Sequence, residues 1–340
     1  METILTKSEP FVPAEWTPQK AIWTAWPADA DEWNGDLEAP RRDVAAMVRA
    51  LAPANIMRVL ANGTEAEVSA RANVGDVVEI VRARYGDIWL RDTGPIFART
   101  PEGLIALRFK VNGWGGKFEL PGDDTVGDDL AHFAGVPTRH FDFVLEGGAI
   151  EHDGDGTILT TRQTMLNANR NVWTESQAEA ALKHAFGADK IVWLDEGLKN
   201  DHTDGHIDNI ARFVDPARVV CQSPSGPDDP NIEILDAVAR ALESATDARG
   251  RKLEVIRIPS PGLVINGLGL PAPASHVNFV IANGVVVMPV YGTPTQDAAR
   301  DALQSAFPDR KVIALPSRGL LGAGGAGGGS FHCITLQEPL

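Results

Sequence analysis

Apolar and polar residues follow one another along this chain in a unit that recurs several times. In HVNFVIANGVVVMPVYGTPTQDAARDALQSAFPDRKVIALP (276–316), two short apolar runs flank Asn283 and Gly284, a helix-period stretch follows Pro294, and KVIAL ends the unit. Asn-Gly between two apolar runs is the strongest short signal for a β-hairpin, and apolar residues spaced by three and four indicate an amphipathic helix. The pattern predicts the order strand, strand, helix, strand.

The same order can be read at three earlier places. These units begin at GPIFARTPEGLIALRFK (94–110), GGAIEHDGDGTILTTR (147–162) and HIDNIARFVDPARVVCQS (206–223). A fifth unit would combine FHCITL from the end of the chain with AIWTAW, a helix over 41–51 and NIMRVL from its beginning. Residues 65–81 would add one further helix and strand.

Repeats of this size cannot each bury their own apolar face, so neighbouring repeats should pack together. We expect a single catalytic α/β domain over residues 1–340, built as a five-bladed pseudo-symmetric propeller of ββαβ repeats. If both chain ends share one blade, no terminal sheet edge is left free. A doubly wound sheet is the less favoured alternative, because hairpins recur where single strands should alternate with helices.

Acidic residues, histidines or a cysteine stand at the junction before the first strand of each unit. The five junctions read WLRDTGPIF, VLEGGAIE, TDGHIDNIARF, ASHVNFVI and GGGSFHCIT. They carry Asp92, Glu146, His206 with Asp208, His276 with Asn278, and His332 with Cys333. Equivalent positions in a ring of repeats converge on its axis, so we expect these groups to meet in one pocket.

Each of these residues also has an ordinary structural interpretation. Asp92 could cap a helix or pair with Arg91, and His206 could be a buried histidine with satisfied hydrogen bonds. Glu146 stands among apolar residues, where an unpaired carboxylate is unfavourable. Cys221 lies in a strand pattern and is interpreted as buried apolar filler. The coincidence of the five junctions is what favours a functional site.

Charge and composition narrow the kind of ligand and location. The formal net charge of −15 argues against a nucleic-acid or anionic-membrane partner and favours a small cation. No apolar run is long enough to cross a membrane, and the chain begins without a secretory-signal pattern. Its two cysteines give no disulfide framework. We therefore expect a cytoplasmic protein.

Two further patterns suggest cofactors but lack the expected context. The glycines at 322–327 match a dinucleotide-binding pattern, yet a strand rather than a helix should follow them. His202 and His206, with the aspartates between and after them, could be read as a metal cluster. A glycine inside that run and a strand directly after it argue against two histidines on one helix face. We expect neither a metal nor a cofactor.

A thiol, a His-x-Asp pair and two further carboxylates form a coherent chemical set. Cysteine is the strongest ordinary nucleophile, and histidine transfers protons near neutral pH. Nearby carboxylates raise the pKa of a thiol, unless the substrate brings a compensating positive charge. A guanidinium group does so, because it is permanently cationic and binds carboxylates through paired hydrogen bonds. His332, if protonated, could help the thiolate to form, but as the neighbour of Cys333 on a predicted strand it should point the other way.

Several segments resemble those of the agmatine deiminase family, which belongs with the bacterial-type peptidylarginine deiminases of the guanidine-modifying superfamily. They are WLRDTGP, VNGWGGKF, LEGGAIE, LNANRN, TDGHIDN and GGGSFHCIT, and the resemblance spans residues 13–337. It implies the pentein fold, a five-bladed α/β propeller, in agreement with the repeats. It also implies hydrolysis of agmatine to N-carbamoylputrescine and ammonia in polyamine biosynthesis, without metal or cofactor, and it suggests a homodimer.

The resemblance implies a role for each catalytic position. Cys333 would attack the guanidinium carbon and form an amidino-cysteine intermediate. His206 would protonate the departing ammonia and then activate water, and Glu146 would orient His206 and the reacting nitrogens. Asp92 and Asp208 would grip the guanidinium.

The resemblance also implies substrate-binding positions. Asp87 matches an acidic position, and Trp89 and Trp114 would line the aliphatic part of the substrate. Ser330 and Phe331 differ from the usual Asn and Ile, and an acidic residue is common where His202 stands, so the pocket wall could differ. The alternatives are a peptidylarginine or other guanidine deiminase, an amidinotransferase, or a guanidine-binding protein without turnover. No arginine or lysine in these motifs is an obvious partner for a substrate carboxylate, which favours agmatine.

Overall fold

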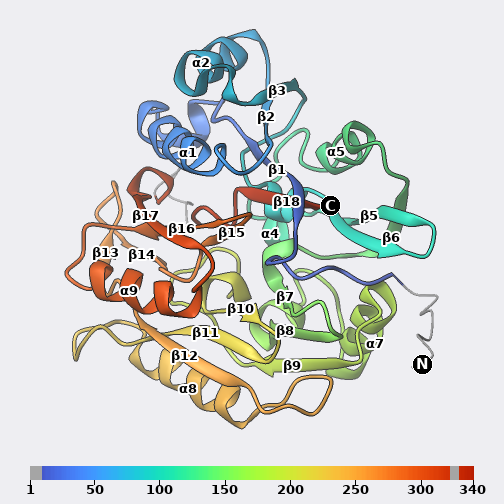
Figure 1. The fold of residues 1–340 in the computed structure, drawn as a ribbon, viewed down its shortest axis with the longest axis vertical. Helices are drawn as coiled ribbons and strands as arrows, with labels where there is room; N and C mark the ends of the chain where they lie inside the picture. Colours follow the sequence, from blue (N-terminus) through green and yellow to red (C-terminus); the bar gives the residue numbers. More distant parts are fainter. Residues whose placement is uncertain (1–9, 322–328) are drawn as a thin grey trace.

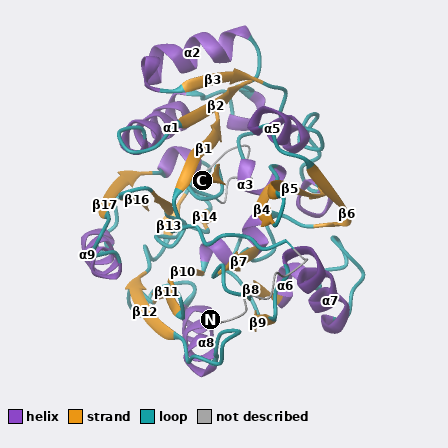
Figure 2. Ribbon diagram, turned by 45° about the vertical axis from the view of Figure 1, so that its right-hand side comes forward, coloured by secondary structure: helices purple, strands orange, loops and turns teal. Residues whose placement is uncertain are grey.

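The computed structural model describes residues 10–321 and 329–340. Within these residues the strands form six sheets, five of which have three or four strands. Figure 1 shows these five sheets around the middle of the molecule with the long helices on the outside, and Figure 2 shows the same arrangement from a turned view. The sixth sheet is a hairpin of β13 (Val264–Ile265) and β14 (Pro271–Ala272). The chain is therefore a mixed α/β protein.

Four sheets in the described residues repeat one order of elements. In each, the first two strands are antiparallel, and the third, which follows a helix, is parallel to the second. The predicted order of strand, strand, helix, strand is confirmed at these four places. Sheet by sheet, the strands are β4 (Ile96–Thr100), β5 (Gly103–Lys110) and β6 (Thr138–Val144); β7 (Ile150–His152), β8 (Thr157–Thr161) and β9 (Lys190–Leu194); β10 (Ala211–Asp215), β11 (Arg218–Ser223) and β12 (Glu254–Pro259); β15 (Val280–Ala282), β16 (Val285–Val290) and β17 (Lys311–Pro316).

Helices connect the second and third strands of these sheets. They are α4 (Gly113–Gly116) with α5 (Val126–Ala134), α6 (Arg162–Met165) with α7 (Glu175–Phe186), α8 (Ile232–Ser244) and α9 (Gln296–Ala306). Local sequence explains α7 well: Thr174 and Gln177 form a capping box at its start, and Gly187 takes a left-handed conformation at its end. Asn283 and Gly284 join β15 to β16 in a two-residue turn with Gly284 at φ +73°, as the hairpin signal predicts.

The two ends of the chain share the remaining sheet, which was also predicted. Its order is β18 (Thr335–Pro339), β1 (Gln19–Ala25), β2 (Met57–Ala61) and β3 (Glu79–Arg82). The connections contain η1 (Asp31–Trp33), α1 (Glu38–Leu51), α2 (Thr64–Val74) and η2 (Gly75–Val77). Because α2 and β3 follow β2, they are the extra helix and strand expected over residues 65–81. Figure 1 shows β18 and β1 next to each other, although they come from opposite ends of the sequence.

A short turn of helix or a bend precedes the first strand of each sheet. These segments are α3 (Leu90–Thr93) before β4, η3 (Gly147–Ala149) before β7 and η4 (Ile207–Asn209) before β10. Turns over 276–277 and 331–334 precede β15 and β18. Cys333 was expected on a strand, but β18 begins only at Thr335 and the backbone N–H of Thr335 donates to the carbonyl of His332 at 3.1 Å. The cysteine therefore lies in a turn, where alternation of side chains does not apply.

Two further features of the sequence are the glycine pattern near its end and the length of its apolar segments. The glycine pattern at 322–327 lies outside the described residues, and η5 (Arg318–Leu320) is the last helical turn before that gap. No helix in the described part of the chain is long and apolar enough to cross a membrane.

Candidate active site

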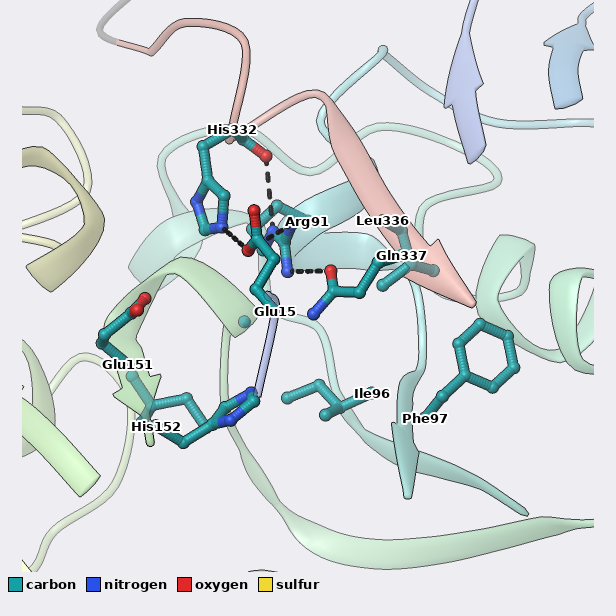
Figure 3. Close-up of a pocket in the computed structure, with 11 residues that line it drawn as sticks. Glu15, Arg91, Ile96, Phe97, Glu151, His152, His332, Leu336 and Gln337 are labelled. Carbon is teal, nitrogen blue, oxygen red and sulfur yellow. Dashed lines mark hydrogen bonds and ion pairs between the residues drawn. The ribbon is translucent and has the colours of Figure 1, made fainter. Parts of the chain in front are cut away.

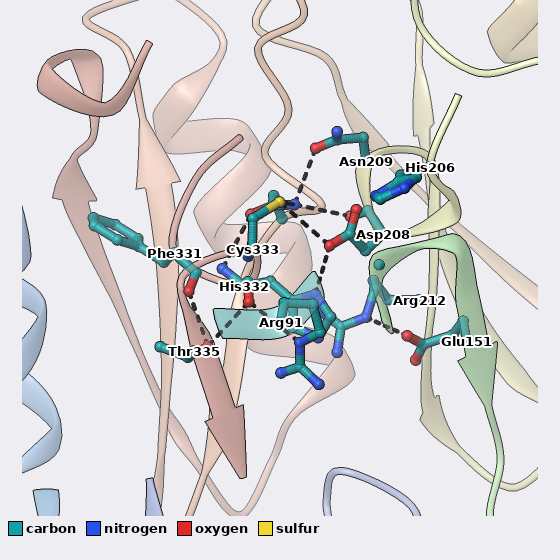
Figure 4. Close-up of polar contacts among 12 residues, drawn as sticks. Arg91, Glu151, His206, Asp208, Asn209, Arg212, Phe331, His332, Cys333 and Thr335 are labelled. Atoms are coloured by element: carbon teal, nitrogen blue, oxygen red, sulfur yellow. Dashed lines mark hydrogen bonds and ion pairs between the residues drawn. The ribbon is translucent and has the colours of Figure 1, made fainter. Parts of the chain in front are cut away.

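Cys333 lies next to side chains from two other junctions, the one before β15 and the one before β10. Asn278 Nδ2 donates to its sulfur at 3.1 Å, and the thiol lies 3.4 Å from Asp208 Oδ2 (Figure 4). Asn278 Oδ1 also accepts from the backbone N–H groups of His332 and Cys333, at 3.0 and 3.3 Å. The turn is fixed further because the Arg91 N–H donates to the Cys333 carbonyl at 3.1 Å. The thiol is thus held in a defined position beside a carboxylate.

The surroundings of Cys333 disfavour the thiolate while no cation is bound. Burial, followed by the carboxylates of Asp208 and Asp92, raises the pKa of this thiol well above its ordinary value. A cation placed between these carboxylates would act in the opposite direction, because it would offset their charge. The pattern is what the sequence argument expected for a thiol that needs a cationic substrate.

His206 lies between two of the predicted carboxylates. Its Nδ1 is 3.7 Å from Asp92 Oδ1, and its Nε2 is 3.8 Å from Glu146 Oε2. Burial alone would lower the pKa of His206, but Asp92 and Glu146 outweigh it and raise the pKa to about 9. The imidazole is therefore protonated at neutral pH and can serve as an acid.

Asp92 is held by its neighbours and cannot rotate freely. Gly148 N–H donates to Oδ1 at 2.9 Å, and Trp114 Nε1 donates to Oδ2 at 2.8 Å. Burial raises the pKa of Asp92 to about 6. A Cβ atom at Gly148 would lie 2.6 Å from His206 Nδ1 and 2.9 Å from Asp92 Oδ1, so only glycine fits between these two groups.

Asp208 presents one oxygen that the described residues leave unused. Oδ2 contacts Cys333 and His332, whereas Oδ1 is buried and has no hydrogen-bond partner among these residues. Burial would raise the pKa of Asp208, but hydrogen bonding and charge from His332 lower it below the ordinary value. Asp208 is therefore an ionised carboxylate. Its Oδ2 lies 3.4 Å from the thiol, and its Oδ1 is a free hydrogen-bond acceptor among the described residues.

The predicted substrate-binding residues flank this cluster from one side. Trp89 lies beside the cysteine turn, since a Cβ at Gly329 would be 2.6 Å from Trp89 Cζ3 and 3.0 Å from Cys333 Sγ. Asp87 accepts from Trp89 Nε1 at 2.8 Å and from Trp33 Nε1 at 3.1 Å. Burial raises the pKa of Asp87 to about 7. Asp87 thus positions Trp89, and within the described residues its carboxylate accepts from the side chains of Trp33 and Trp89 and from neither Cys333 nor His206.

The remaining junction residues divide into two groups. Asn278 belongs to the cluster, but His276 Nδ1 pairs with the Pro259 carbonyl at 3.0 Å and its ring stacks on Tyr291. His332 was expected to point away from the thiol and this is wrong: in the turn, its ring and the Cys333 thiol both face Asp208 Oδ2. Cys221, as expected, is buried among apolar side chains.

The sequence departures lie at the edge of the cluster or outside it. Phe331 is buried in the apolar core, and the Ser330 and Ser317 hydroxyls are 2.5 Å apart. His202 contacts Phe118 edge to face, and its carbonyl accepts from Lys117. In residues 10–321 and 329–340, no group of three His, Cys, Asp or Glu side chains is arranged to hold a metal ion.

Sequence reasoning missed two charged residues at the site. Arg170, in the segment LNANRN, donates from Nε to Glu146 Oε1 at 2.9 Å and also pairs with Asp204. Glu15, in the segment PAEW, pairs with His332 at 2.9 Å and with Arg212 at 2.7 Å. Glu15 carried the signal noted for Glu146, a charged residue among apolar neighbours, but Arg170 stands between two asparagines and carried no such signal. Neither residue stands at a junction between repeats.

The site combines a thiol, a protonated imidazole and three carboxylates, all buried. A family model described as Porphyromonas-type peptidyl-arginine deiminase matches residues 11–339, nearly the whole chain. The chain belongs to this family. The matched stretch includes all five junctions and every residue assigned to the site.

Individual relatives and solved structures carry a more specific name. The agmatine deiminase of Stutzerimonas stutzeri (strain A1501) is 36% identical over 97% of this chain and 95% of its own. The structure of agmatine deiminase of Enterococcus faecalis has a TM-score of 0.92 at 27% identity and covers 100% of this chain and 99% of its own. A C. jejuni agmatine deiminase with substrate bound, in which a cysteine is replaced by serine, has a TM-score of 0.88 at 26% identity, over 99% and 98% of the two chains.

Proposed function

We propose that this protein is an agmatine deiminase, which hydrolyses agmatine to N-carbamoylputrescine and ammonia. The observation that carries the proposal is the position of Cys333: its sulfur lies 3.4 Å from Asp208 Oδ2, and Asp208 Oδ1 has no hydrogen-bond partner in the described residues. A guanidinium bound by Asp208 and Asp92 would bring its carbon next to the sulfur and supply the positive charge that the thiol lacks. Relatives at 36% identity over nearly the full length are named agmatine deiminases.

The first chemical step is attack by the sulfur of Cys333 on the guanidinium carbon. The thiol loses its proton to solvent as the substrate charge offsets Asp92 and Asp208, and the thiolate sulfur forms a C–S bond to the guanidinium carbon, which gives a neutral tetrahedral adduct. The C–N bond to one amino nitrogen then breaks. His206, protonated at neutral pH, gives its proton to that nitrogen, which leaves as ammonia. The product of this step is a positively charged thiouronium on Cys333.

The second step is hydrolysis of the thiouronium. His206, now neutral, removes a proton from water, and the oxygen bonds to the carbon. As the C–S bond breaks and the carbonyl of the product forms, the remaining hydroxyl proton passes to the departing sulfur, which returns as the thiol. Glu146 stabilises the imidazolium that this step regenerates, since its oxygen lies 3.8 Å from Nε2 and Arg170 fixes it from the other side. Trp89 and Trp114 would line the aliphatic chain of the substrate.

A peptidylarginine or free arginine deiminase is the second candidate, because it would use the same reacting groups and the family description names that activity. Arginine and peptides carry a carboxylate or an amide chain beside the aliphatic part. Lys117, the one cation in the matched motif VNGWGGKF, is already paired with Asp204 at 2.6 Å. An amidinotransferase would pass the amidino group to an amine instead of water and would release no ammonia.

Ammonia release decides between these functions. Purified protein is assayed with agmatine, with arginine and with a blocked arginyl peptide in parallel, and product is identified by mass. We expect release from agmatine and none from the other two. Release from arginine or the peptide would keep the chemistry and change the substrate, whereas no release from any of them, with transfer to an added amine, would identify an amidinotransferase.

We also propose that the five larger sheets are the blades of one propeller within a single catalytic domain. The repeated strand order and the sheet shared by both chain ends support this description. The homodimer, the cytoplasmic location and the absence of a cofactor stay predictions.

A further inference from the structure

A second buried histidine contacts Asp208, at the carboxylate oxygen that also faces the Cys333 thiol. His332 Nδ1 lies 2.8 Å from Asp208 Oδ2, and His332 Nε2 lies 2.9 Å from Glu15 Oε2. Figure 3 shows the ring directed toward Glu15, and Figure 4 places His332 beside Cys333 and Asp208. The side chains of Glu15, His332 and Asp208 are all buried.

Hydrogen-bond inventory fixes the charge of this histidine. An ionised carboxylate can only accept hydrogen bonds, so a ring between two of them satisfies both only when both nitrogens carry hydrogen. Burial would raise the pKa of Glu15, but Arg212, His332 and Arg91 hold it well below its usual range. Arg212 Nη2 lies 2.7 Å from Glu15 Oε2, and the N–H of Ile281 donates to Oε1 at 2.8 Å. Each ring nitrogen of His332 thus faces a carboxylate oxygen, at 2.8 and 2.9 Å, and this geometry calls for hydrogen on both nitrogens.

Other charged groups complete the surroundings of His332. Arg91 donates from Nε to the His332 carbonyl at 3.3 Å, and its Nη2 lies 3.6 Å from Glu15 Oε2. Arg212 also pairs with Glu151, at 2.7 Å. Positive and negative groups therefore alternate from Arg212 through Glu15 and His332 to Asp208, so the order ends with a carboxylate at the thiol.

We propose that His332 and Glu15 are positioning residues for the reaction: Glu15 fixes the His332 imidazolium, which occupies Oδ2 of Asp208 and leaves Oδ1 for the guanidinium. The same positive charge partly offsets Asp208 at the sulfur of Cys333. This inference rests on the proposed function, because it assigns the groups that prepare that site for a guanidinium. Neither residue touches the substrate.

His152 provides a matched comparison within the same region. It lines one small cavity of about 20 Å³ together with Glu15 and His332, and it is partly buried, whereas His332 is fully buried. Burial lowers the pKa of His152 to about 3, so its ring is neutral. Its Nδ1 has no hydrogen-bond partner in the described residues, and it does not touch Asp208. The two histidines differ in their carboxylate contacts.

The test compares His332→Asn with His152→Asn in the full-length protein. Asparagine at 332 keeps an amide donor near Asp208 but removes the charge. We expect KM for agmatine to rise about tenfold or more, which is the loss of about one charge-assisted hydrogen bond, while His152→Asn leaves KM unchanged. Glu15→Gln should also raise KM for agmatine.

The second measurement needs no substrate, so it separates this proposal from the proposed function. The rate at which iodoacetamide alkylates Cys333 is followed against pH in a Cys221→Ala background. We expect His332→Asn to shift the profile by about one unit to higher pH, so that the rate at a fixed lower pH falls about tenfold, because a positive charge near the sulfur is lost. His152→Asn should leave the profile in place.

The proposal is overturned if His332→Asn keeps both the wild-type KM and the wild-type alkylation profile. If that variant does not fold, neutron diffraction from wild-type crystals decides the matter. Deuterium on both ring nitrogens of His332 supports the proposal, and deuterium on only one of them refutes it. A wild-type protein that fails to turn over agmatine would refute the proposed function and leave the alkylation and neutron measurements valid.

Discussion

The two cysteines show how similar burial leads to different chemistry. Cys221 lies in the middle of β11 and packs in an apolar cluster with residues such as Val219 and Leu235. Cys333 is almost as buried, with 3% of its surface exposed against 0% for Cys221. Burial raises the pKa of both thiols. After burial, the largest causes at Cys333 are the carboxylates of Asp208 and Asp92, whereas at Cys221 they are Arg257 and Glu243, which act in opposite directions. The part of the Cys333 shift that comes from carboxylates can be reversed by a bound cation.

The comparison teaches that a raised thiol pKa does not by itself mark an inert cysteine. A shift caused by apolar surroundings persists whatever binds nearby, because the low dielectric remains. A shift caused by Asp208 and Asp92 depends on whether their charge is balanced. The reactive thiol is therefore the one whose pKa the substrate itself can lower.

Replacing the sulfur at the junction should have the largest effect. In Cys333→Ser the weaker hydroxyl nucleophile replaces the thiol, and we expect kcat for agmatine to fall by at least about three orders of magnitude. Ammonia release in a steady-state assay measures this, and circular dichroism shows whether the fold is kept. Substantial activity in this variant would remove the covalent mechanism altogether.

His206 should come next, because it moves the protons of both steps. His206→Asn removes the ionisable ring, and we expect kcat to fall by about 10²- to 10⁴-fold, while iodoacetamide still alkylates Cys333. Single-turnover kinetics with mass detection of the modified cysteine separate the two steps. If this variant alkylated slowly and turned over normally, His206 would not be the acid.

Gly148 tests whether the carboxylates and His206 must meet as closely as they do. A methyl group in Gly148→Ala would stand 2.6 Å from His206 Nδ1, so these side chains must move, and we expect kcat/KM to fall about 100-fold. Gly226→Ala is the control, because a Cβ there has no heavy atom within 4 Å. Equal losses in the two variants would mean that the effect is on folding.

The pH dependence of kcat/KM tests the carboxylates that a cation would need. A carboxyl group is neutral below its pKa, so attraction for the guanidinium weakens as the pH falls through about 6 for Asp92, while Asp87, which holds Trp89, loses its charge below about 7. We expect an acid limb in this range, with about a tenfold loss per unit below it. Asp87→Asn should move the limb to lower pH, and an unchanged limb would exclude Asp87 as its source.

The smallest effect is expected at the other cysteine and completes the comparison. Cys221→Ser places a hydroxyl in an apolar cluster, which should lower the free energy of unfolding by about 1–3 kcal/mol. Urea denaturation measures that loss, and kcat should stay at the wild-type value. A large fall in kcat with normal stability would show that the roles inferred for the two cysteines are wrong.

Much of the fold can be predicted from the sequence. The apolar runs around Asn283 and Gly284, and the capping box with Gly187 around α7, specify local structure because each signal lies within a few residues. Repetition of that local pattern then indicated which positions are equivalent. This is why Asp92, Glu146, His206, Asp208 and Cys333 could be named before their distances were known.

What the sequence could not supply are the contacts between distant segments. Glu15 and His332 are separated by 317 positions, and no local pattern couples them. The direction of His332 also depended on a turn that ends just before Thr335, so the alternation of a strand gave the wrong answer. The protonation of His206 and the raised pKa of Cys333 follow from which carboxylates lie nearby and how little water reaches them. Local periodicity determined the helices, the strands and the junctions between repeats. Packing alone determined which buried groups are protonated, because the electrostatic environment of a group depends on distances in space.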